Sequence, residues 1–290
     1  MTAISDDLPL PPRRFSLATA IRRNPTITFG AVLLSILVVV AIFAPYIAYA
    51  DPFKLSPVNR LRPPSERWWF GTDQFGRDVF SRTVYGARVS LIVGLTVALF
   101  SSAVGLTLGL LCGYFRRIDG IVMRIMDGLM AIPSILLAIA LITLTRPGLG
   151  IVILAIVIPE VPRIVCVVRA VVLSIRSQPY IESAIAGGTK NTKLLLRHVL
   201  PNTLAPLIVQ STYVCASAML IEAGLSFLGA GVPPEVPSWG NIIAQGRTFF
   251  QIAPWTILIP GIFLAITVLA VNLLGDGLRD RLDPRLARRL

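Results

Sequence analysis

Charged residues are scarce in this sequence. Only 14% of its 290 residues are Asp, Glu, Lys or Arg, whereas a soluble domain carries about 25%. Hydrophobic residues make up 54% of the chain, and the mean hydropathy is +0.75. This composition excludes an ordinary soluble domain and indicates an integral membrane protein of a single domain.

Histidine and cysteine are also rare. His198 is the only histidine, which argues against a zinc site and against a Ser/His/Asp catalytic triad. The cysteines Cys112, Cys166 and Cys215 lie in apolar segments without paired spacing, so we expect packing residues rather than a disulfide framework or a metal site. The sequence therefore predicts no bound metal.

The chain lacks a nucleotide-binding motif as well. The run Gly187-Gly188-Thr189-Lys190 resembles a Walker A loop, but Thr189 replaces the glycine that must precede the lysine. We therefore expect no enzymatic activity and no cofactor in this chain. If the protein moves a solute uphill, the energy must come from outside the chain.

The net charge of +12 does not indicate a nucleic-acid partner. Single-strand binding proteins interleave basic residues with aromatic residues. In this chain the basic residues bracket apolar runs instead. The positive-inside rule and contact with anionic membrane lipid account for this pattern. Arginines before the first apolar run and in the C-terminal tail place both termini in the cytoplasm.

Six apolar runs are long enough to cross a bilayer, which takes about 20 residues. The predicted fold is an all-α polytopic membrane helix bundle of about six transmembrane helices. The predicted spans are Ile27–Tyr49, Ser90–Tyr114, Ile125–Thr145 with a kink at Pro133, Gly150–Leu173, Thr203–Leu228 and Trp255–Leu274. We divide the chain into a cytoplasmic tail with an elbow (1–26), a transmembrane domain (27–278) and a cytoplasmic C-terminal tail (279–290).

The first run has a second interpretation. Ala48-Tyr49-Ala50 before Asp51 resembles the cleavage site of a signal peptide. Apolar regions of signal peptides run only about 7–15 residues, and this run is longer, which favours an uncleaved anchor.

The predicted outer loop, residues 51–88, is rich in arginine. Asp73 with Arg77, and Asp78 with Arg82, have the spacing of helical ion pairs, so we expect a solvated, locally paired loop. The four tryptophans also fall on the predicted outer side, where indoles favour the headgroup level.

Small residues recur at every fourth position of the second span. Gly105, Gly109 and Gly113 form a stripe that lets another helix approach closely. A packing seam beside a transport pathway and ordinary helix packing both fit, and the pattern favours ordinary packing.

The segment between the fourth and fifth spans, residues 174–202, is polar, basic and long for a connection. Pro179 and Pro201 bracket it, and Gly187-Gly188 permits a bend. We therefore predict two short helices that project into the cytoplasm and can be held by another protein.

This segment resembles the EAA loop of permease subunits in ATP-binding-cassette (ABC) importers. Glu182, Ala184, Gly188, Leu200 and Pro201 match its motif in register, while Ser183 and His198 depart from it. The resemblance assigns these positions to coupling with an ATPase. Residues 70–91, 221–229, 237–241 and 275–280 resemble the dipeptide/oligopeptide/nickel branch of these permeases, specifically the C-type subunit.

The resemblance implies the type I importer permease fold in a bacterial inner membrane. It implies a heterodimer with a homologous B-type permease, two ATP-binding subunits that carry ATP and Mg, and an extracytoplasmic solute-binding protein. Di- or oligopeptides are the implied substrates, with nickel chelates or glutathione as alternatives within the branch. An ion- or proton-coupled secondary carrier and a membrane scaffold remain rivals, although we find no internal repeat of the kind that secondary carriers often show.

Two acids lie inside predicted spans. Glu160 and Arg163 sit near the centre of the fourth span, where each charge costs about 2.5–3.5 kcal/mol, and their i,i+3 spacing allows them to pair. One hypothesis is that this segment lines the pathway and that Glu160 meets a peptide ammonium. The other is a structural ion pair at a helix kink. For Glu222 we prefer a hydrogen-bonded structural acid, although a carrier would use all three residues as relays.

Overall fold

The computed structural model describes residues 25–145 and 148–282, and its regular structure there is helical throughout. A single isolated β-bridge, between Thr72 and Asp78, is the only extended pairing in these residues. The predicted N-terminal elbow, the turn at Arg146-Pro147 and the end of the C-terminal tail lie outside the described residues.

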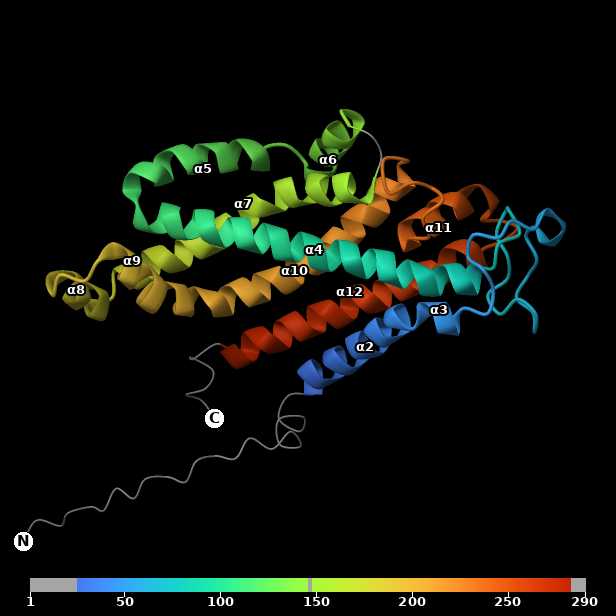
Figure 1. Ribbon diagram of the computed structural model, residues 1–290, viewed down its shortest axis with the longest axis horizontal. Helices are drawn as coiled ribbons and strands as arrows, with labels where there is room; N and C mark the ends of the chain where they lie inside the picture. The colour runs from blue at the N-terminus through green and yellow to red at the C-terminus, as the bar shows by residue number, and fades with distance from the viewer. Residues whose placement is uncertain (1–24, 146–147, 283–290) are drawn as a thin grey trace, which may run out of the picture.

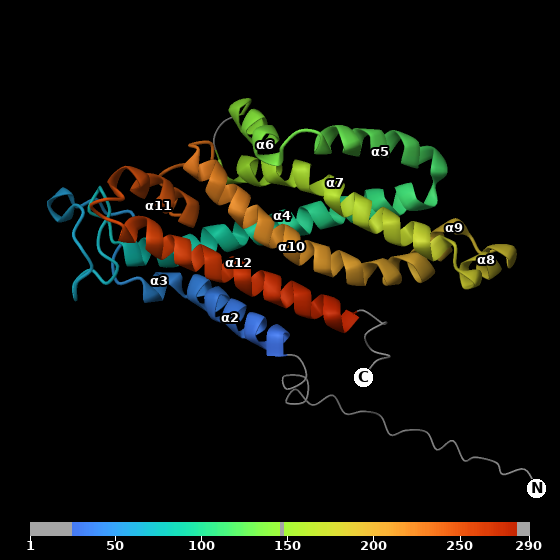
Figure 2. The same ribbon diagram turned by 180° about the vertical axis from the view of Figure 1, so that it is seen from behind.

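Five long helices run side by side and form an elongated bundle (Figures 1 and 2). These are α2 (Pro25–Ile42), α4 (Val79–Tyr114), α7 (Leu149–Arg176), α10 (Leu200–Phe227) and α12 (Trp255–Leu282). Each belongs to a segment that is long and apolar enough to cross a membrane. The prediction of an all-α polytopic bundle is therefore confirmed.

The third predicted span is not one continuous helix. It is replaced by α5 (Arg116–Met130) and α6 (Ser134–Thr143), which meet at an angle of 89°. The predicted kink at Pro133 is confirmed, and it is a complete break. Proline lacks an N–H donor and disfavours helical geometry in the residue before it, so Ala131 and Ile132 leave the helix. Counted as one broken span, the pair raises the number of candidate membrane spans among the described residues from five to six.

Several predicted boundaries also shift. Asp78 caps α4 by accepting a hydrogen bond from the Ser81 backbone N–H at 2.7 Å, so the end of the predicted outer loop is helical. The other long outer connection contains α11 (Trp239–Gly246). Three further short elements are α3 (Ala44–Ile47), η1 (Pro57–Asn59) and η3 (Arg247–Phe249). Residues 48–78 and α11 together form one end of the bundle, which we call the α11 end (Figure 1).

The glycine stripe of α4 packs against α7. A Cβ atom built on Gly105, Gly109 or Gly113 would lie 2.5–2.6 Å from the Cβ of an α7 residue, in each case too close for a side chain. The α7 residues that fill the three positions are Ile164, Val168 and Val172. The stripe therefore lies in a close contact between the two helices and fixes the α4–α7 distance.

Replacement of Gly109 by alanine tests this contact. The added methyl group would collide with the Cβ of Val168, and overpacking of this kind costs about 1–3 kcal/mol. Gly261→Ala is the control, because Gly261 lies in α12 with no atom within 4 Å of its would-be Cβ. We expect Gly109→Ala to lower the thermal unfolding temperature in detergent and Gly261→Ala to leave it unchanged or raise it. Equal behaviour of the two variants would contradict a close seam.

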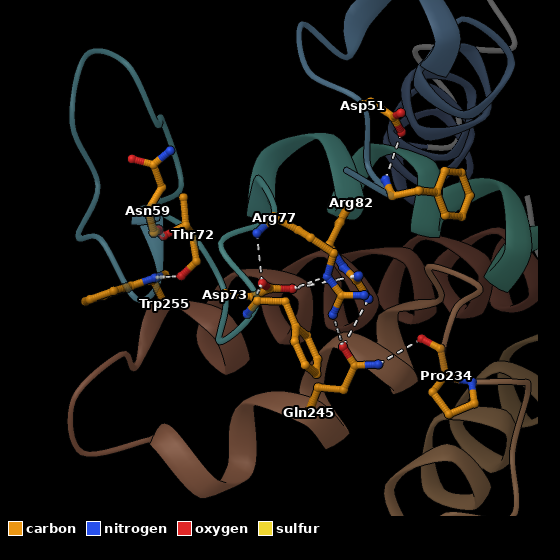
Figure 3. A network of polar contacts seen from close by, with 11 residues as sticks. Asp51, Asn59, Thr72, Asp73, Arg77, Arg82, Pro234, Gln245 and Trp255 are labelled. Carbon is orange, nitrogen blue, oxygen red and sulfur yellow. Dashed lines mark hydrogen bonds and ion pairs between the residues drawn. The ribbon is translucent and has the colours of Figure 1, made fainter. Parts of the chain in front are cut away.

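Four charged residues at the α11 end, Asp73, Arg77, Asp78 and Arg82, are buried rather than solvated, contrary to the expectation (Figure 3). The charged side chains of residues 51–67 are exposed, as expected of a solvated loop. Asp73 accepts from Arg77 Nε at 2.7 Å, as predicted, although this pair lies in a turn. Arg82 lies 3.7 Å from the same carboxylate, and both arginines donate to the Gln245 side-chain oxygen. The predicted Asp78–Arg82 pair does not form, because Asp78 caps α4.

Aromatic side chains complete this end of the bundle. Tyr49 donates a hydrogen bond to Asp78 at 2.7 Å, and its ring contacts Trp69 and Phe80. Burial, followed by the neighbouring Asp78 carboxylate, raises the pKa of Tyr49 far above its usual value, so its hydroxyl remains a donor at neutral pH. Trp239, the first residue of α11, is fully buried, and its indole N–H donates to the Thr83 carbonyl at 2.9 Å. This hydrogen bond holds α11 to α4.

Candidate coupling segment and pathway residues

The predicted projecting segment forms two short helical pieces beyond the end of α7. These are α8 (Pro179–Ala186) and α9 (Asn191–Leu194), the latter continued by a π-helical turn (Leu195–Val199) into α10. They lie at the end of the bundle opposite the α11 end, which we call the α8 end (Figures 1 and 2). The prediction of two short helices is confirmed.

Local sequence signals build this segment. Pro179 occupies the first turn of α8, where its missing N–H costs nothing. Gly188 ends α8 in the left-handed region, with φ of +76°. Its N–H donates to the Ile185 carbonyl at 2.9 Å, and Thr189 N–H donates to the Ala184 carbonyl at 3.1 Å. This is a Schellman motif, which needs glycine at the position of Gly188.

Buried and exposed positions alternate along the segment. Ile181, Leu194 and Val199 are buried and anchor it to the bundle. Of the residues assigned to coupling, Glu182, Ser183, Gly188 and Pro201 are exposed, and Ala184, His198 and Leu200 are half-buried. Exposed apolar side chains lie among them, namely Tyr180, Ile185 and Leu196. The segment therefore presents a mixed apolar and polar surface to its surroundings.

The predicted charge pair of α7 forms. Arg163 Nη1 lies 3.1 Å from Glu160 Oε1, and Ser217 of α10 donates to the same oxygen at 3.5 Å. The Glu160 side chain is fully buried, whereas 43% of the Arg163 side chain is exposed. Pro159 and Pro162 lie inside α7 without interrupting its assignment as one helix.

Glu222 of α10 is fully buried near the α11 end. Its Oε1 accepts hydrogen bonds from Ser226 and Ser238, both at 2.9 Å. Its Oε2 has no hydrogen-bond partner among the described residues. No hydrogen bond or ion pair joins Glu222 to Glu160 or Arg163 in that part of the chain. The structure thus brings Glu160 and Arg163 together and leaves Glu222 as a separate hydrogen-bonded acid of the bundle.

No group of three potential metal-ligating side chains occurs in the residues that the structure describes. The three cysteines are free; Cys112 and Cys215 are buried and Cys166 is half-buried. They pack in the bundle, as predicted.

Comparison with known proteins identifies the family. Residues 105–288 match the family described as binding-protein-dependent transport system inner membrane component. Residues 18–64 match the N-terminal transmembrane domain of oligopeptide transport permease C. The chain belongs to this permease family.

Named relatives align with the permease over most of its length. The "Probable peptide ABC transporter permease protein y4tQ" of Sinorhizobium fredii is 57% identical over 92% of both chains. The dipeptide transport system permease protein DppC of Alkalihalophilus pseudofirmus is 44% identical over 92% of this chain and 88% of the relative. The oligopeptide transport system permease protein OppC of Bacillus subtilis is 37% identical, with the same coverage.

A solved structure supports the fold of the permease. A chain of the inward-facing MetNI methionine ABC transporter superposes with a TM-score of 0.58 at 21% identity. The match covers 70% of the permease and 97% of that chain. The type I importer permease fold is therefore confirmed by structural likeness.

The permease also contains a polar network at the base of the projecting segment that sequence reasoning missed. Tyr114, at the end of α4, donates from its hydroxyl to the Asn191 side chain at 2.7 Å. Arg176 donates to the Tyr114 carbonyl at 3.0 Å, and Arg169 forms a two-pronged pair with Asp119 of α5. These partners are far apart in sequence, so no local spacing could reveal them. The network ties α4, α5, α7 and α9 together.

The Asp119–Arg169 pair gives a test of this network. We expect Asp119→Ala and Arg169→Ala each to lower the free energy of unfolding by about 1 kcal/mol or less, because the pair is partly solvated. In a double-mutant cycle of thermal unfolding, the double variant Asp119→Ala with Arg169→Ala should lose less stability than the sum of the two single losses. A coupling energy of zero would show that the bidentate contact contributes nothing.

Proposed function

We propose that this permease is one transmembrane subunit of an ATP-driven importer for di- or oligopeptides or a related small solute. Relatives named for peptide, dipeptide and oligopeptide transport align with about nine-tenths of the chain. The observation that carries the proposal is the α8–α9 segment, whose residues match the EAA loop in register and project from the bundle. This projecting segment offers an exposed surface that a partner protein can bind and move.

Coupling follows from this form. An ATPase subunit in the cytoplasm would hold the exposed face of α8 around Glu182, Ser183 and Gly188. Closure of two ATPase subunits, which carry ATP and Mg, would then pull this segment. Because buried Ile181 and Leu194 anchor the segment, and Tyr114 joins it to α4, the pull would reach the spanning helices. This chain itself would need no cofactor and perform no catalysis.

The remaining partners complete the pathway. A homologous B-type permease would form the other half of a heterodimer, and a solute-binding protein would deliver substrate at the α11 end. We place the complex in a bacterial inner membrane. The directions of α2 and α12 support both termini on the cytoplasmic side, because α2 runs toward the α11 end and α12 runs away from it (Figures 1 and 2).

A proton-coupled carrier is the second candidate function, favoured only by the intramembrane acids Glu160 and Glu222. Arg163 pairs with Glu160, and no hydrogen bond in the described residues links the two acids into a relay. This arrangement supports the ABC importer over the carrier.

The deciding experiment is solute uptake by membrane vesicles that contain the whole complex. We expect uptake to stop on ATP depletion or vanadate addition, and to survive an uncoupler while ATP is supplied. Copurification of ATPase subunits in mild detergent is the accompanying measurement. Accumulation against a gradient by the purified permease alone in liposomes would overturn the proposal.

A further inference from the structure

The guanidinium of Arg163 is exposed near the middle of a membrane-spanning helix. The helix α7 has 28 residues, so Arg163 lies about 20 Å from either end at 1.5 Å per residue. Its partner Glu160 is fully buried, and therefore the exposed member of the pair is the cation. A charge exposed at this depth faces water or other protein rather than lipid.

The pair leaves part of the guanidinium free. Arg163 Nη1 makes both contacts to the Glu160 carboxylate, at 3.1 and 3.4 Å. The Nε and Nη2 groups donate to no other described residue. A guanidinium presents its donors as a planar fork that matches a carboxylate. Glu160 fixes one edge of this fork, and the other edge remains available.

A partly polar face of α10 lies beside the pair. Ser217 donates to Glu160, and Tyr213, one turn earlier on the same face, is exposed. Gly224, two turns after Ser217, has no atom within 4 Å of its would-be Cβ. Hydroxyl groups, a glycine and a free guanidinium edge together suit a polar solute better than lipid.

We propose that Arg163 is a substrate-binding residue of the permease, and that its free guanidinium edge binds the carboxylate of a peptide C-terminus. Glu160 is then a positioning residue, because its buried carboxylate orients the guanidinium and does not reach the solute. Glu160 also neutralises the pair, which keeps the attraction weak enough for release, as a transport pathway requires. The inference rests on the proposed function, since it presumes a translocation pathway for peptides.

The first experiment measures access to position 163. Arg163→Cys is introduced into a permease whose three cysteines are alanine, and the whole complex is exposed in vesicles to a membrane-impermeant methanethiosulfonate reagent. We expect the introduced thiol to be labelled. Leu154→Cys is the matched control, because Leu154 is also exposed but lies nine residues away, on the opposite face of α7. We expect no labelling there.

The second experiment tests the ligand chemistry. Without the solute-binding protein, Ala-Ala added from the ATPase side should slow the labelling of the Arg163→Cys variant about tenfold, and the C-terminal amide of Ala-Ala should not, because it lacks the charge that a guanidinium binds. In uptake assays the Arg163→Gln variant should import peptide about tenfold more slowly than the wild type, and Arg163→Lys should retain most of the uptake rate. Modification of the Arg163→Cys variant with a cationic reagent should sustain uptake, and an anionic reagent should abolish it.

Three results would overturn the inference. Absence of labelling in every nucleotide state would show that Arg163 packs against the partner permease, whose acid would be its ligand. Equal protection of the thiol by the amide would show that position 163 does not recognise the peptide carboxylate. Failure of both Arg163→Cys and Arg163→Gln to assemble would assign the pair a structural role. In each case wild-type vesicles would still import peptide with ATP, whereas failure of the proposed function would abolish that import.

Discussion

Gly188→Glu is expected to abolish ATP-dependent uptake while the permease remains folded in the membrane. The left-handed conformation of Gly188, with φ of +76°, costs other residues about 1–2 kcal/mol. Any new side chain there would also stand on the exposed tip of the α8–α9 segment, because no atom lies within 4 Å of its would-be Cβ. Bulk and negative charge would therefore be added where the ATPase is proposed to bind. We expect at least about a tenfold loss of ATPase copurification, the equivalent of 1.4 kcal/mol.

The chain offers a matched control for this prediction. Gly229 ends α10 with the same motif, with φ of +82° and no neighbour within 4 Å of its would-be Cβ. It lies at the α11 end, away from the proposed ATPase site. Gly229→Glu should carry a similar backbone cost and leave ATPase copurification intact. Gly188→Ala is a second control, because alanine carries the backbone cost of the left-handed conformation without the bulk and charge of glutamate. Normal copurification of the ATPase with Gly188→Glu would remove α8 from the coupling interface.

The two short helices of the α8–α9 segment could be predicted because their signals are local. Pro179 starts a helix, Gly188 ends it, and the residues that carry the resemblance lie within about twenty positions. The packing stripe of α4 was equally readable, since Gly105, Gly109 and Gly113 repeat with the period of one helix face. The spans followed from apolar length alone, which is why the existence of each was predictable and the ends were not.

The broken third span shows where this reasoning stops. Pro133 indicates a disturbance, but it does not determine whether the helix bends slightly or turns by 89°. That angle depends on how α6 packs against α7, which is a tertiary contact. The exposure of Arg163 was hidden for the same reason. Its i,i+3 spacing from Glu160 predicted a pair, but only the bundle decides which member is buried.

One of the two ion pairs predicted within residues 73–82 is wrong, because its acid lies at the N-terminus of a helix and caps that helix. Asp78 has the right spacing from Arg82, yet it serves as the cap of α4. Arg82 instead reaches Asp73 and Gln245, and the latter lies 163 residues away in sequence. Burial follows from this convergence, because the loop folds back onto α11 and covers the charges (Figure 3). A local pattern could not anticipate it.

Asp73→Asn is expected to destabilise the α11 end by about 3–5 kcal/mol, the usual effect of removing one member of a buried ion pair. The asparagine oxygen can still accept from the Phe75 and Arg77 backbone N–H groups, which Asp73 Oδ1 now does at 2.8 and 2.9 Å. The substitution therefore removes charge with little change in size. The buried guanidinium of Arg82 would be left without a compensating negative charge, and its Nε and Nη1 already lack a hydrogen-bond partner among the described residues.

Two further variants separate charge from shape in this network. Asp51→Asn alters an exposed acid of the same loop. Among the described residues its carboxylate accepts only from the Phe53 N–H, so the substitution should change stability by less than about 1 kcal/mol. Arg82→Met added to Asp73→Asn should recover much of the loss, because replacing both charges avoids an uncompensated buried cation. Thermal unfolding in detergent and protease cleavage of residues 51–78 are the measurements. If Asp73→Asn alone unfolds like the wild type, water must reach Arg82 and the burial of this network does not control its stability.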